Sequence, residues 1–328
     1  MTPSSLKLNI YIVTMIAIVL LMAIISCLSV LTHDVQKLKV AYTKACKSNV
    51  NYDVYTEAVI PIPETTTTYS SHYARFTADL VLRLVKSYKH GLLIPSCLTS
   101  VATCNSEHGK NAFWCLKSPG KVWLVFRGTC THKEWTNNFE MQYAPKIILL
   151  LKRKATEVTF PVLTEKYETV ENNIFPDTIK VHAGFIHTYM YLRERIFQFL
   201  KTLDTNVEIN ITGHSLGGAL GLITTADILL NLPHFHGLIN TYVYGTPRVG
   251  NTAFASLLNN AVGGKLNSLY LVINNADIVP TVPMAVQPNI YNPDEPYEYC
   301  HPSSMITFIK NLGSWQENHR IETYIDNI

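Results

Sequence analysis

The residues best suited to chemistry are a serine and its flanking glycines at residues 213–217, which read Gly-His-Ser-Leu-Gly. The apolar run at residues 207–212 predicts a strand before this serine, and the run at residues 216–231 predicts a helix after it. A G-x-S-x-G segment between a strand and a helix is typical of a sharp turn that lifts the serine hydroxyl above the edge of a sheet. We therefore predict that Ser215 is a nucleophile. The other members of the predicted nucleophile elbow are Gly213, His214 and Gly217.

A serine nucleophile needs a base that accepts its proton and a carboxylate that orients the base. In sheets that present a serine in this way, the three groups follow in the chain order Ser, Asp, His. Asp277 is the strong candidate for the acid, because it follows the predicted strand at residues 268–273 and sites in parallel sheets lie at the carboxyl ends of strands. Asp294, in a proline-rich loop, is the alternative. This order leaves two candidates for the base, His301 and His319.

Acyl transfer also needs two hydrogen-bond donors for the oxyanion that forms on the carbonyl oxygen. The backbone N–H of Leu216, directly after the serine, is the first candidate. The second should come from a loop after an earlier strand, and the predicted strand at residues 121–126 leads into Gly128 and Thr129. Gly128 permits a close approach, and Thr129 offers an N–H and a hydroxyl. An ordinary strand-ending turn is the alternative interpretation.

The elements that must position these groups alternate along the chain. Strands are predicted at residues 121–126, 207–212, 239–244 and 268–273. Helices are predicted at residues 74–88, 185–203, 216–231 and 252–261. This alternation predicts the α/β class, with a mostly parallel central sheet and helices on both of its faces. Because no internal repeat or long linker interrupts the rest of the chain, we expect a single domain over residues 35–328.

An apolar run at residues 10–31 precedes this domain. With a rise of about 1.5 Å per residue, a helix over this run could cross a bilayer core of about 30 Å. The stretch Cys27-Leu28-Ser29 could instead form the cleavage site of a signal peptide. Residues 1–31 are therefore expected to contain a hydrophobic helix that acts as a signal peptide or as a membrane anchor. Either role places the domain in the secretory pathway, secreted or attached to a membrane through a single span.

The composition supports the same location and excludes other classes. Of seven cysteines, Cys27 lies in the apolar run, and the remaining six form an even number that suits an oxidising compartment. We expect two or three disulfides among the six, and six free thiols in a cytosolic domain are the alternative. With 27 Lys and Arg against 24 Asp and Glu, the net charge of +3 is too weak for a nucleic-acid binder. The chain has no C-x-x-C pair, so no zinc site is expected.

Five segments form a characteristic series along the chain: VFRGT at 125–129, VHAGF at 181–185, GHSLGG at 213–218, YGTPRVGN at 244–251 and NADIVP at 275–280. With these segments the chain resembles the class 3 lipases, the fungal-lipase-like family of α/β-hydrolases. The resemblance implies the α/β-hydrolase fold. In this family the catalytic histidine lies near the C-terminus, a few residues before an aromatic residue. His319 and Tyr324 match that pattern, so the resemblance implies His319 as the base, and it also implies Thr129 as an oxyanion donor.

The resemblance further implies a lid, an amphipathic helix over the active site that begins just after Thr129. The candidate lid residues are Lys133, Glu134, Trp135 and Phe139. Farther along, an apolar run at residues 147–151 is followed by basic residues at 152–154. These residues predict either a segment that seats the lid region on a lipid surface or an internal strand that ends in a solvated basic turn.

The function that the resemblance implies is that of a serine carboxylic-ester hydrolase acting on lipids at an interface. Triacylglycerol is the first expected substrate, and phospholipase A1 activity is the alternative. A catalytically silent lipid-binding homologue is the alternative from another class, but it would have no need for a complete Ser, Asp and His set in this order. The chemistry requires neither a cofactor nor a metal ion. Contact with a membrane is expected, and nucleic acid is not expected as a partner.

Overall fold

The fold is described from a computed structural model in residues 61–90, 94–95, 97–105, 111–128, 147–150, 168–171, 174–287 and 296–328. The chain divides into two units, Met1–Val54 and Tyr55–Ile328, and every described residue lies in the second. The predicted signal peptide or anchor at residues 1–31 lies outside the described residues. None of the helices within the described ranges combines the length and the apolar composition that a membrane span requires.

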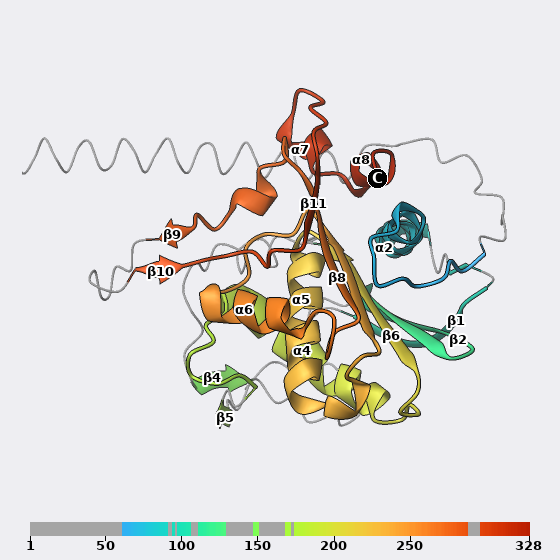
Figure 1. The fold of residues 1–328 in the computed structure, drawn as a ribbon, viewed down its shortest axis with the longest axis vertical. Helices are drawn as coiled ribbons and strands as arrows, with labels where there is room; N and C mark the ends of the chain where they lie inside the picture. Colours follow the sequence, from blue (N-terminus) through green and yellow to red (C-terminus); the bar gives the residue numbers. More distant parts are fainter. Residues whose placement is uncertain are drawn as a thin grey trace, which may run out of the picture. The chain divides into compact units, whose positions relative to one another are not determined.

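A central sheet of seven strands organises the described part of the chain (Figure 1). Its strands, in spatial order, are β1 (Thr99–Asn105), β2 (Asn111–Ser118), β3 (Lys121–Phe126), β6 (Glu208–His214), β7 (Ile239–Tyr244), β8 (Ser268–Asn274) and β11 (Met305–Phe308). The first three pair antiparallel, whereas β3, β6, β7, β8 and β11 pair parallel. The predicted α/β class with a mostly parallel sheet is confirmed. Because the parallel strands run the same way, the carboxyl ends of β6 and β8 lie along one edge, where sites in such sheets are found.

Helices cover both faces of the sheet, as the sequence predicts (Figure 1). The long helix α2 (Ser71–His90) and the short helix α8 (Ile321–Ile325) lie on one face. On the other face lie α4 (Ala183–Leu200), α5 (Leu216–Asn231) and α6 (Thr252–Ala261). The nucleophile elbow is therefore the connection between the middle of the sheet and a helix that packs directly on it.

The side chains of strand β3 alternate between the hydrophobic cores on the two faces of the sheet. Val122, Leu124 and Phe126 pack into the core beneath α4, α5 and α6, whereas Trp123 and Val125 pack into the core beneath α2. All of these side chains are fully buried. Successive side chains of a strand point to opposite faces, so a strand between two helical layers needs an unbroken apolar run. That requirement explains why such runs predict the central strands so well.

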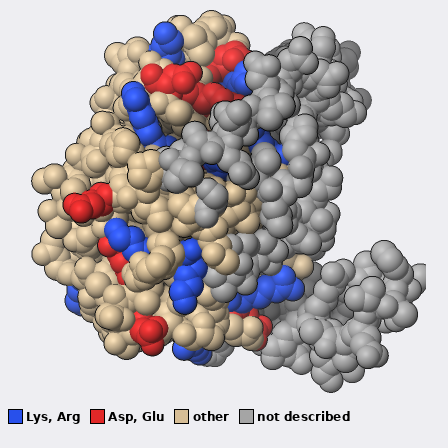
Figure 2. Space-filling view, turned by 90° about the vertical axis from the view of Figure 1, so that its right-hand side faces the viewer, with Lys and Arg blue, Asp and Glu red and all other residues tan. Residues whose placement is uncertain are grey.

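The side of the molecule that carries α2 faces the viewer in Figure 2. Most of the described surface in this view is uncharged, and the lysine and arginine side chains are interspersed with aspartate and glutamate. The described surface of this face therefore presents no continuous basic stripe of the kind that binds nucleic acid.

Two small antiparallel sheets accompany the central one. One pairs β4 (Ile147–Leu150) with β5 (Glu168–Glu171), and the other pairs β9 (Val286–Gln287) with β10 (Tyr297–Glu298). The apolar run at residues 147–151 therefore contains a strand, as one of its two interpretations predicts, and the basic residues after it lie outside the described ranges. The short helices are η1 (Pro233–Phe235), η2 (Val279–Thr281) and α7 (Trp315–Asn318).

The cysteines correct one expectation. Cys97, Cys115 and Cys300 are free. Two or three disulfides among the six cysteines are therefore excluded, since three free thiols leave at most one pair. Cys115 shows a physical reason, because it lies in β2 opposite Leu124 of β3 and is fully buried. Burial raises the pKa of its thiol, so Cys115 serves as a small apolar side chain of the core.

Candidate active site

Ser215 lies between the end of β6 and the start of α5, where the sequence predicts a sharp turn. Its φ of 58° and ψ of −128° are unusual for a residue with a side chain, and no other described non-glycine residue has a positive φ. Neighbouring backbone groups hold this conformation: the Ser215 N–H donates to Tyr244 O at 3.0 Å, and its carbonyl accepts from Gly218 N at 2.9 Å. The turn thereby presents the hydroxyl at the carboxyl edge of the parallel strands.

Two glycines permit this turn because neighbouring backbone occupies the space where a side chain would lie. A Cβ on Gly213 would collide with the carbonyl group of Gly217. A Cβ on Gly217 would in turn collide with the carbonyl oxygens of Phe126 and Arg127. Only glycine at both positions lets β3, β6 and α5 approach one another closely around Ser215.

The side chains of Ser215, His319 and Asp277 form one hydrogen-bonded line. His319 Nε2 lies 2.8 Å from Ser215 Oγ, and His319 Nδ1 lies 2.6 Å from Asp277 Oδ2. Both distances are those of hydrogen bonds. Because an ionised carboxylate can only accept, Nδ1 carries a proton, and in the neutral ring Nε2 then presents its lone pair to the serine hydroxyl. This arrangement can remove the proton from Ser215.

Asp277 is buried, and further donors surround its carboxylate. Besides its bond to His319, Oδ2 accepts a hydrogen bond from the Tyr324 hydroxyl at 2.7 Å, and Oδ1 accepts one from the Val279 N–H at 2.9 Å. The Asp277 side chain has 0% exposed surface, whereas the His319 side chain is 14% exposed. Burial raises the pKa of Tyr324 well above its usual range, and the negative charge of Asp277 raises it further, so this hydroxyl remains a donor.

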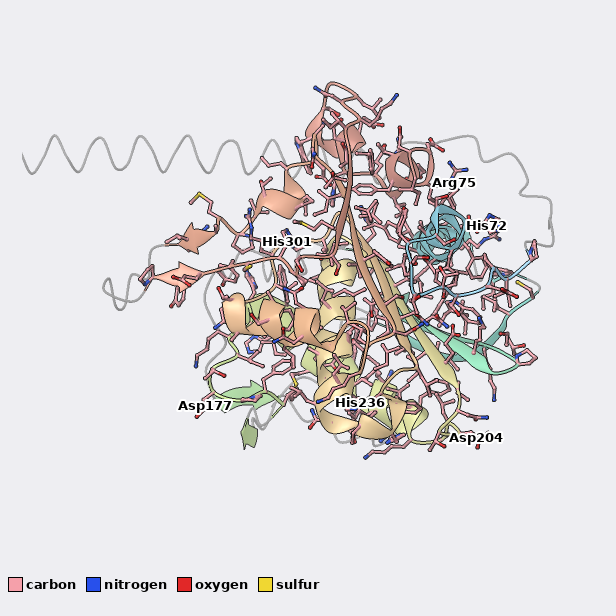
Figure 3. All side chains as sticks on the ribbon, in the orientation of Figure 1. His72, Arg75, Asp177, Asp204, His236 and His301 are labelled. Atoms are coloured by element: carbon pink, nitrogen blue, oxygen red, sulfur yellow. The ribbon has the colours of Figure 1, made fainter. Side chains whose placement is uncertain are left out.

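The alternative base, His301, which is labelled in Figure 3, bonds to a different partner. Its Nε2 lies 2.8 Å from the carbonyl oxygen of Pro280 in η2, and burial lowers the pKa of its ring. His319 is thus the histidine that the structure places on the serine. The alternative acid, Asp294, lies outside the described residues.

The predicted oxyanion donors are described only in part. Leu216 begins α5, so its N–H is one of the helix N-terminal groups that have no partner within the helix. Gly128 follows β3, and a Cβ on it would lie 3.1 Å from His214 O and 3.3 Å from Ser215 Cβ. The segment that follows β3 therefore runs directly beside the serine. The predicted residues that lie outside the described ranges are Thr129 and the candidate lid residues Lys133, Glu134, Trp135 and Phe139.

His214 makes a contact that the sequence does not reveal. Its ring packs against that of His319, with ring centroids 4.5 Å apart and planes tilted by 34°. Burial lowers the pKa of His214 well below its usual range, and the charge of His319 lowers it further, so the ring is neutral. Contacts between residues so distant in sequence leave no local pattern, and only the position of His214 next to Ser215 could have pointed to it.

A strained serine at the carboxyl edge of a parallel sheet, with a histidine and a buried aspartate in line behind it, defines the α/β-hydrolase class. Within the described ranges, no three His, Cys, Asp or Glu side chains are grouped so that they could hold a metal ion. A solved structure of Rhizomucor miehei lipase, a deletion mutant in its propeptide complex, is similar to this chain with a TM-score of 0.51. It is 19% identical and covers 82% of this chain and 85% of its own, and the likeness concerns the fold alone.

The sequence model of the class 3 lipases matches residues 123–287. The chain belongs to the class 3 lipase family. A secreted mono- and diacylglycerol lipase of Malassezia globosa is 36% identical over 159 residues, which are 45% of this chain and 47% of the relative. A phospholipase A1 of Arabidopsis thaliana is 24% identical over 226 residues, which are 62% of this chain and 47% of the relative. The chain therefore spans about half the length of the curated relatives it matches.

Proposed function

We propose that this chain is a serine hydrolase that cleaves carboxylic esters in lipids. The observation that supports this proposal most strongly is the line of hydrogen bonds from Ser215 Oγ through His319 to Asp277, with distances of 2.8 and 2.6 Å. Membership of the class 3 lipase family supports lipid esters as the substrates. A protein that only binds lipid has no need for a serine held at a φ of 58° beside a histidine.

The proposed reaction begins when Ser215 Oγ attacks the ester carbonyl carbon while His319 Nε2 accepts the hydroxyl proton. Asp277 keeps the imidazole in the required tautomer and stabilises the positive charge that forms on it. The imidazolium then donates its proton to the departing alcohol, and the acyl group stays on Ser215 as an ester. In the second half, His319 removes a proton from water, the oxygen attacks the acyl ester, and Ser215 recovers its proton as the fatty acid departs.

The negative charge on the carbonyl oxygen needs donors that are in place before the reaction. We assign one donor to the N–H of Leu216, because the N-terminus of α5 adds the positive end of a helix dipole. We assign the second to Thr129, which the family resemblance implies and which follows Gly128 beside the serine. The lid is assigned to the segment that contains Lys133, Glu134, Trp135 and Phe139.

Acylglycerols are the proposed substrate class. Two Malassezia globosa relatives, 36% and 34% identical, are secreted mono- and diacylglycerol lipases, whereas the Arabidopsis phospholipase A1 is 24% identical. We therefore place mono-, di- and triacylglycerol ahead of phospholipid, with phospholipase A1 activity as the alternative. Because these lipids gather in droplets and membranes, the enzyme is proposed to work in contact with a lipid surface.

We also propose that residues 35–328 form one catalytic domain and that residues 1–31 act as a signal peptide or a membrane anchor. The Malassezia globosa relatives are secreted proteins, which supports a place in the secretory pathway or outside the cell. Western blots of cell and medium fractions, with and without residues 1–31, distinguish cleavage from anchoring.

A Ser215→Ala variant tests the proposed function. We expect hydrolysis of a soluble short-chain ester to fall by a factor of about 10⁴ or more, because the nucleophile is removed. Ser303→Ala is a matched control, since Ser303 is exposed and its hydroxyl bonds to Asn259. Emulsions of mono-, di- and triacylglycerol and of phosphatidylcholine then rank the substrates. Full activity in Ser215→Ala would reject the proposal.

A further inference from the structure

Two asparagines that neighbour the acid and the base are buried. Asn274 ends β8 shortly before Asp277 and is 0% exposed, and Asn318 directly precedes His319 and is 6% exposed. A buried side-chain amide carries two N–H donors and a carbonyl acceptor, each of which is costly to leave without a partner. The partners of these two amides therefore show which parts of the site they hold.

The two amides bond reciprocally across the site. Asn274 Nδ2 donates to the carbonyl oxygen of Asn318 at 3.1 Å, and this carbonyl belongs to the peptide that joins Asn318 to His319. Asn318 Nδ2 donates to the carbonyl oxygen of Ala276 at 2.9 Å, and this carbonyl belongs to the peptide that joins Ala276 to Asp277. The amide of Asn274 thus holds the peptide group that leads into His319, and the amide of Asn318 holds the peptide group that leads into Asp277.

The remaining groups of both amides tie down the loop that follows β11. Asn274 Nδ2 also donates to Lys310 O at 2.8 Å, and Asn274 Oδ1 accepts from Lys310 N at 2.9 Å. The same Oδ1 accepts from Ala276 N at 3.1 Å. Asn318 Oδ1 accepts from Leu312 N at 2.7 Å. A buried network whose polar groups are all paired is rigid, so three chain segments are held as one unit.

The regular elements on either side of the histidine are short. His319 follows α7, which has 4 residues, and the nearest strand before it in the chain, β11, also has 4 residues. A helix of this length has no stability of its own. By contrast, Ser215 lies at the junction of a central strand and a helix of 16 residues. The position of His319 relative to β8 therefore depends on side-chain hydrogen bonds together with the packing of α8, which follows the histidine and buries Ile321 and Tyr324.

We propose that Asn274 and Asn318, here called the asparagine clamp, position Asp277 and His319 for catalysis. The clamp rests on the proposed serine hydrolase function and adds two positioning residues that do not touch the reacting atoms. It maintains the 2.6 Å hydrogen bond between His319 Nδ1 and Asp277 Oδ2. A displacement of about 1 Å within such a constellation can lower a rate by about 100-fold.

The first test compares Asn318→Ala with Asn240→Ala in the full chain. Asn240 is 1% exposed, and its amide bonds at the amino end of β7, to Asn210, Asn267 and Ser268. We expect Asn318→Ala to lower kcat for a soluble short-chain ester by about 10- to 100-fold and to change KM by less than about twofold. Asn240→Ala should lower the melting temperature at least as much as Asn318→Ala does. It should nevertheless leave kcat within about twofold, because Asn240 lies at the amino ends of the parallel strands, away from the site at their carboxyl ends.

A second variant removes the hydrogen-bond donor and, once ionised, adds a negative charge. Asn318→Asp keeps the shape of the side chain and the acceptor for Leu312 N, but it loses the N–H that bonds to Ala276 O. Asn318→Asp should therefore show the same loss of kcat as Asn318→Ala. It replaces Asn318→Ala in the comparison with Asn240→Ala if Asn318→Ala does not fold. The proton on His319 Nδ1 is expected to give a strongly downfield NMR resonance in the unmodified chain, and both variants should shift or broaden it.

The clamp would be overturned if Asn318→Ala and Asn318→Asp kept the kcat of the unmodified chain. It would also be overturned if Asn318→Ala and Asn240→Ala lost kcat in the same proportion to their loss of melting temperature, since a general loss of stability would then explain both. A failure of the proposed function looks different, because Ser215→Ala itself would then keep full activity.

Discussion

Two buried aspartates distinguish a structural from a chemical region of this molecule. Asp227 lies within α5 and Asp277 follows β8, and both side chains have 0% exposed surface. Asp227 accepts hydrogen bonds from Arg193 Nε at 2.6 Å and Nη2 at 3.1 Å, from the Tyr189 hydroxyl at 2.5 Å and from Asn231 Nδ2 at 2.7 Å. Its negative charge is permanently matched by the guanidinium, so Asp227 joins α4 to α5.

Asp277 is surrounded differently. It accepts from His319, from the Tyr324 hydroxyl and from the Val279 N–H, and within the described ranges no lysine or arginine bonds to it. Its charge therefore meets a cation only when the ring of His319 takes up a proton. Such a carboxylate stabilises the transition state more than the ground state. Burial of an aspartate therefore does not by itself distinguish Asp277 from Asp227. The difference is that Asp277 is buried without a permanently charged partner.

After Ser215→Ala, the largest expected effect is that of Asp277→Asn. An amide at this position can donate to His319 Nδ1, which favours the tautomer whose Nε2 faces Ser215 with a proton instead of a lone pair. We expect kcat for a soluble ester to fall by about 10⁴-fold, with the far-ultraviolet circular dichroism unchanged. A kcat within tenfold of the unmodified chain would remove Asp277 from the proposed mechanism.

Asp227→Asn should show the reverse pattern. It leaves the half-buried guanidinium of Arg193 without its carboxylate. We expect the free energy of unfolding in urea to fall by about 4 kcal/mol, while kcat of the folded protein stays within about twofold. If this variant lost as much activity as Asp277→Asn, the distinction between the two aspartates would not hold.

The pH dependence of stability brings in a third buried group, the imidazole of His182. His182 is buried with both ring nitrogens unpaired among the described residues, and it stacks on Phe185 with centroids 4.0 Å apart. Burial lowers the pKa of His182 to about 4. Since an unfolded histidine has a pKa of about 6.5, the unfolded chain binds the proton first as the pH falls. The stability that the folded chain gains from burying a neutral His182 is therefore complete above about pH 6.5 and is lost as the pH falls from about 6.5 to 4.

His182→Phe checks this assignment, because a phenyl ring keeps the stack on Phe185 and does not titrate. We expect the variant to retain about 3 kcal/mol more stability at pH 4, relative to its own value at pH 7, than the unmodified chain. Urea unfolding at a series of pH values measures the difference. Identical pH dependence in the two proteins would exclude His182 and leave the acid limb to other groups, among them the buried His214 and His301.

The smallest expected effect is that of Tyr324→Phe. The variant removes one of the donors to Asp277 Oδ2 and the acceptor of a longer bond from Asn274 N, at 3.3 Å. It keeps the aromatic ring against Phe308, whose centroid is 5.3 Å away. We expect kcat to fall by about 3- to 10-fold, in line with the net value of about 1 kcal/mol for one hydrogen bond. An unchanged kcat would limit Tyr324 to a packing role.

The nucleophile side of the site could be predicted from the sequence because local patterns determine it. The strand before Ser215 and the helix after it follow each other directly, so their apolar runs and the glycines of the elbow fall in one short segment. The predicted bounds of α5 and β7 agree with the structure, because both elements are buried throughout most of their length.

The acid and base side was harder to predict. The residues alone left His301 and His319 open, and the choice came from the family resemblance. His319 is bonded to Asp277, which lies 42 residues earlier in the chain, and the preceding Asn318 is bonded to Asn274, 44 residues earlier. Contacts over such separations leave no periodic pattern. The edge strands were missed for a related reason: β1 reads TSVATCN, and β11 has 4 residues that alternate between exposed and half-buried. A strand at an edge needs fewer apolar side chains, so its signal is weak.

The most direct measurement of the central assignment is the rate at which a fluorophosphonate labels the chain, followed by mass spectrometry to locate the adduct. Such a reagent reacts with a serine that a neighbouring base activates. We predict a single adduct on Ser215, formed much more slowly in Asp277→Asn and at an unchanged rate in Asp227→Asn. An unlabelled Ser215, or equal rates in the two aspartate variants, would contradict the assignment of Ser215, His319 and Asp277 as one catalytic unit.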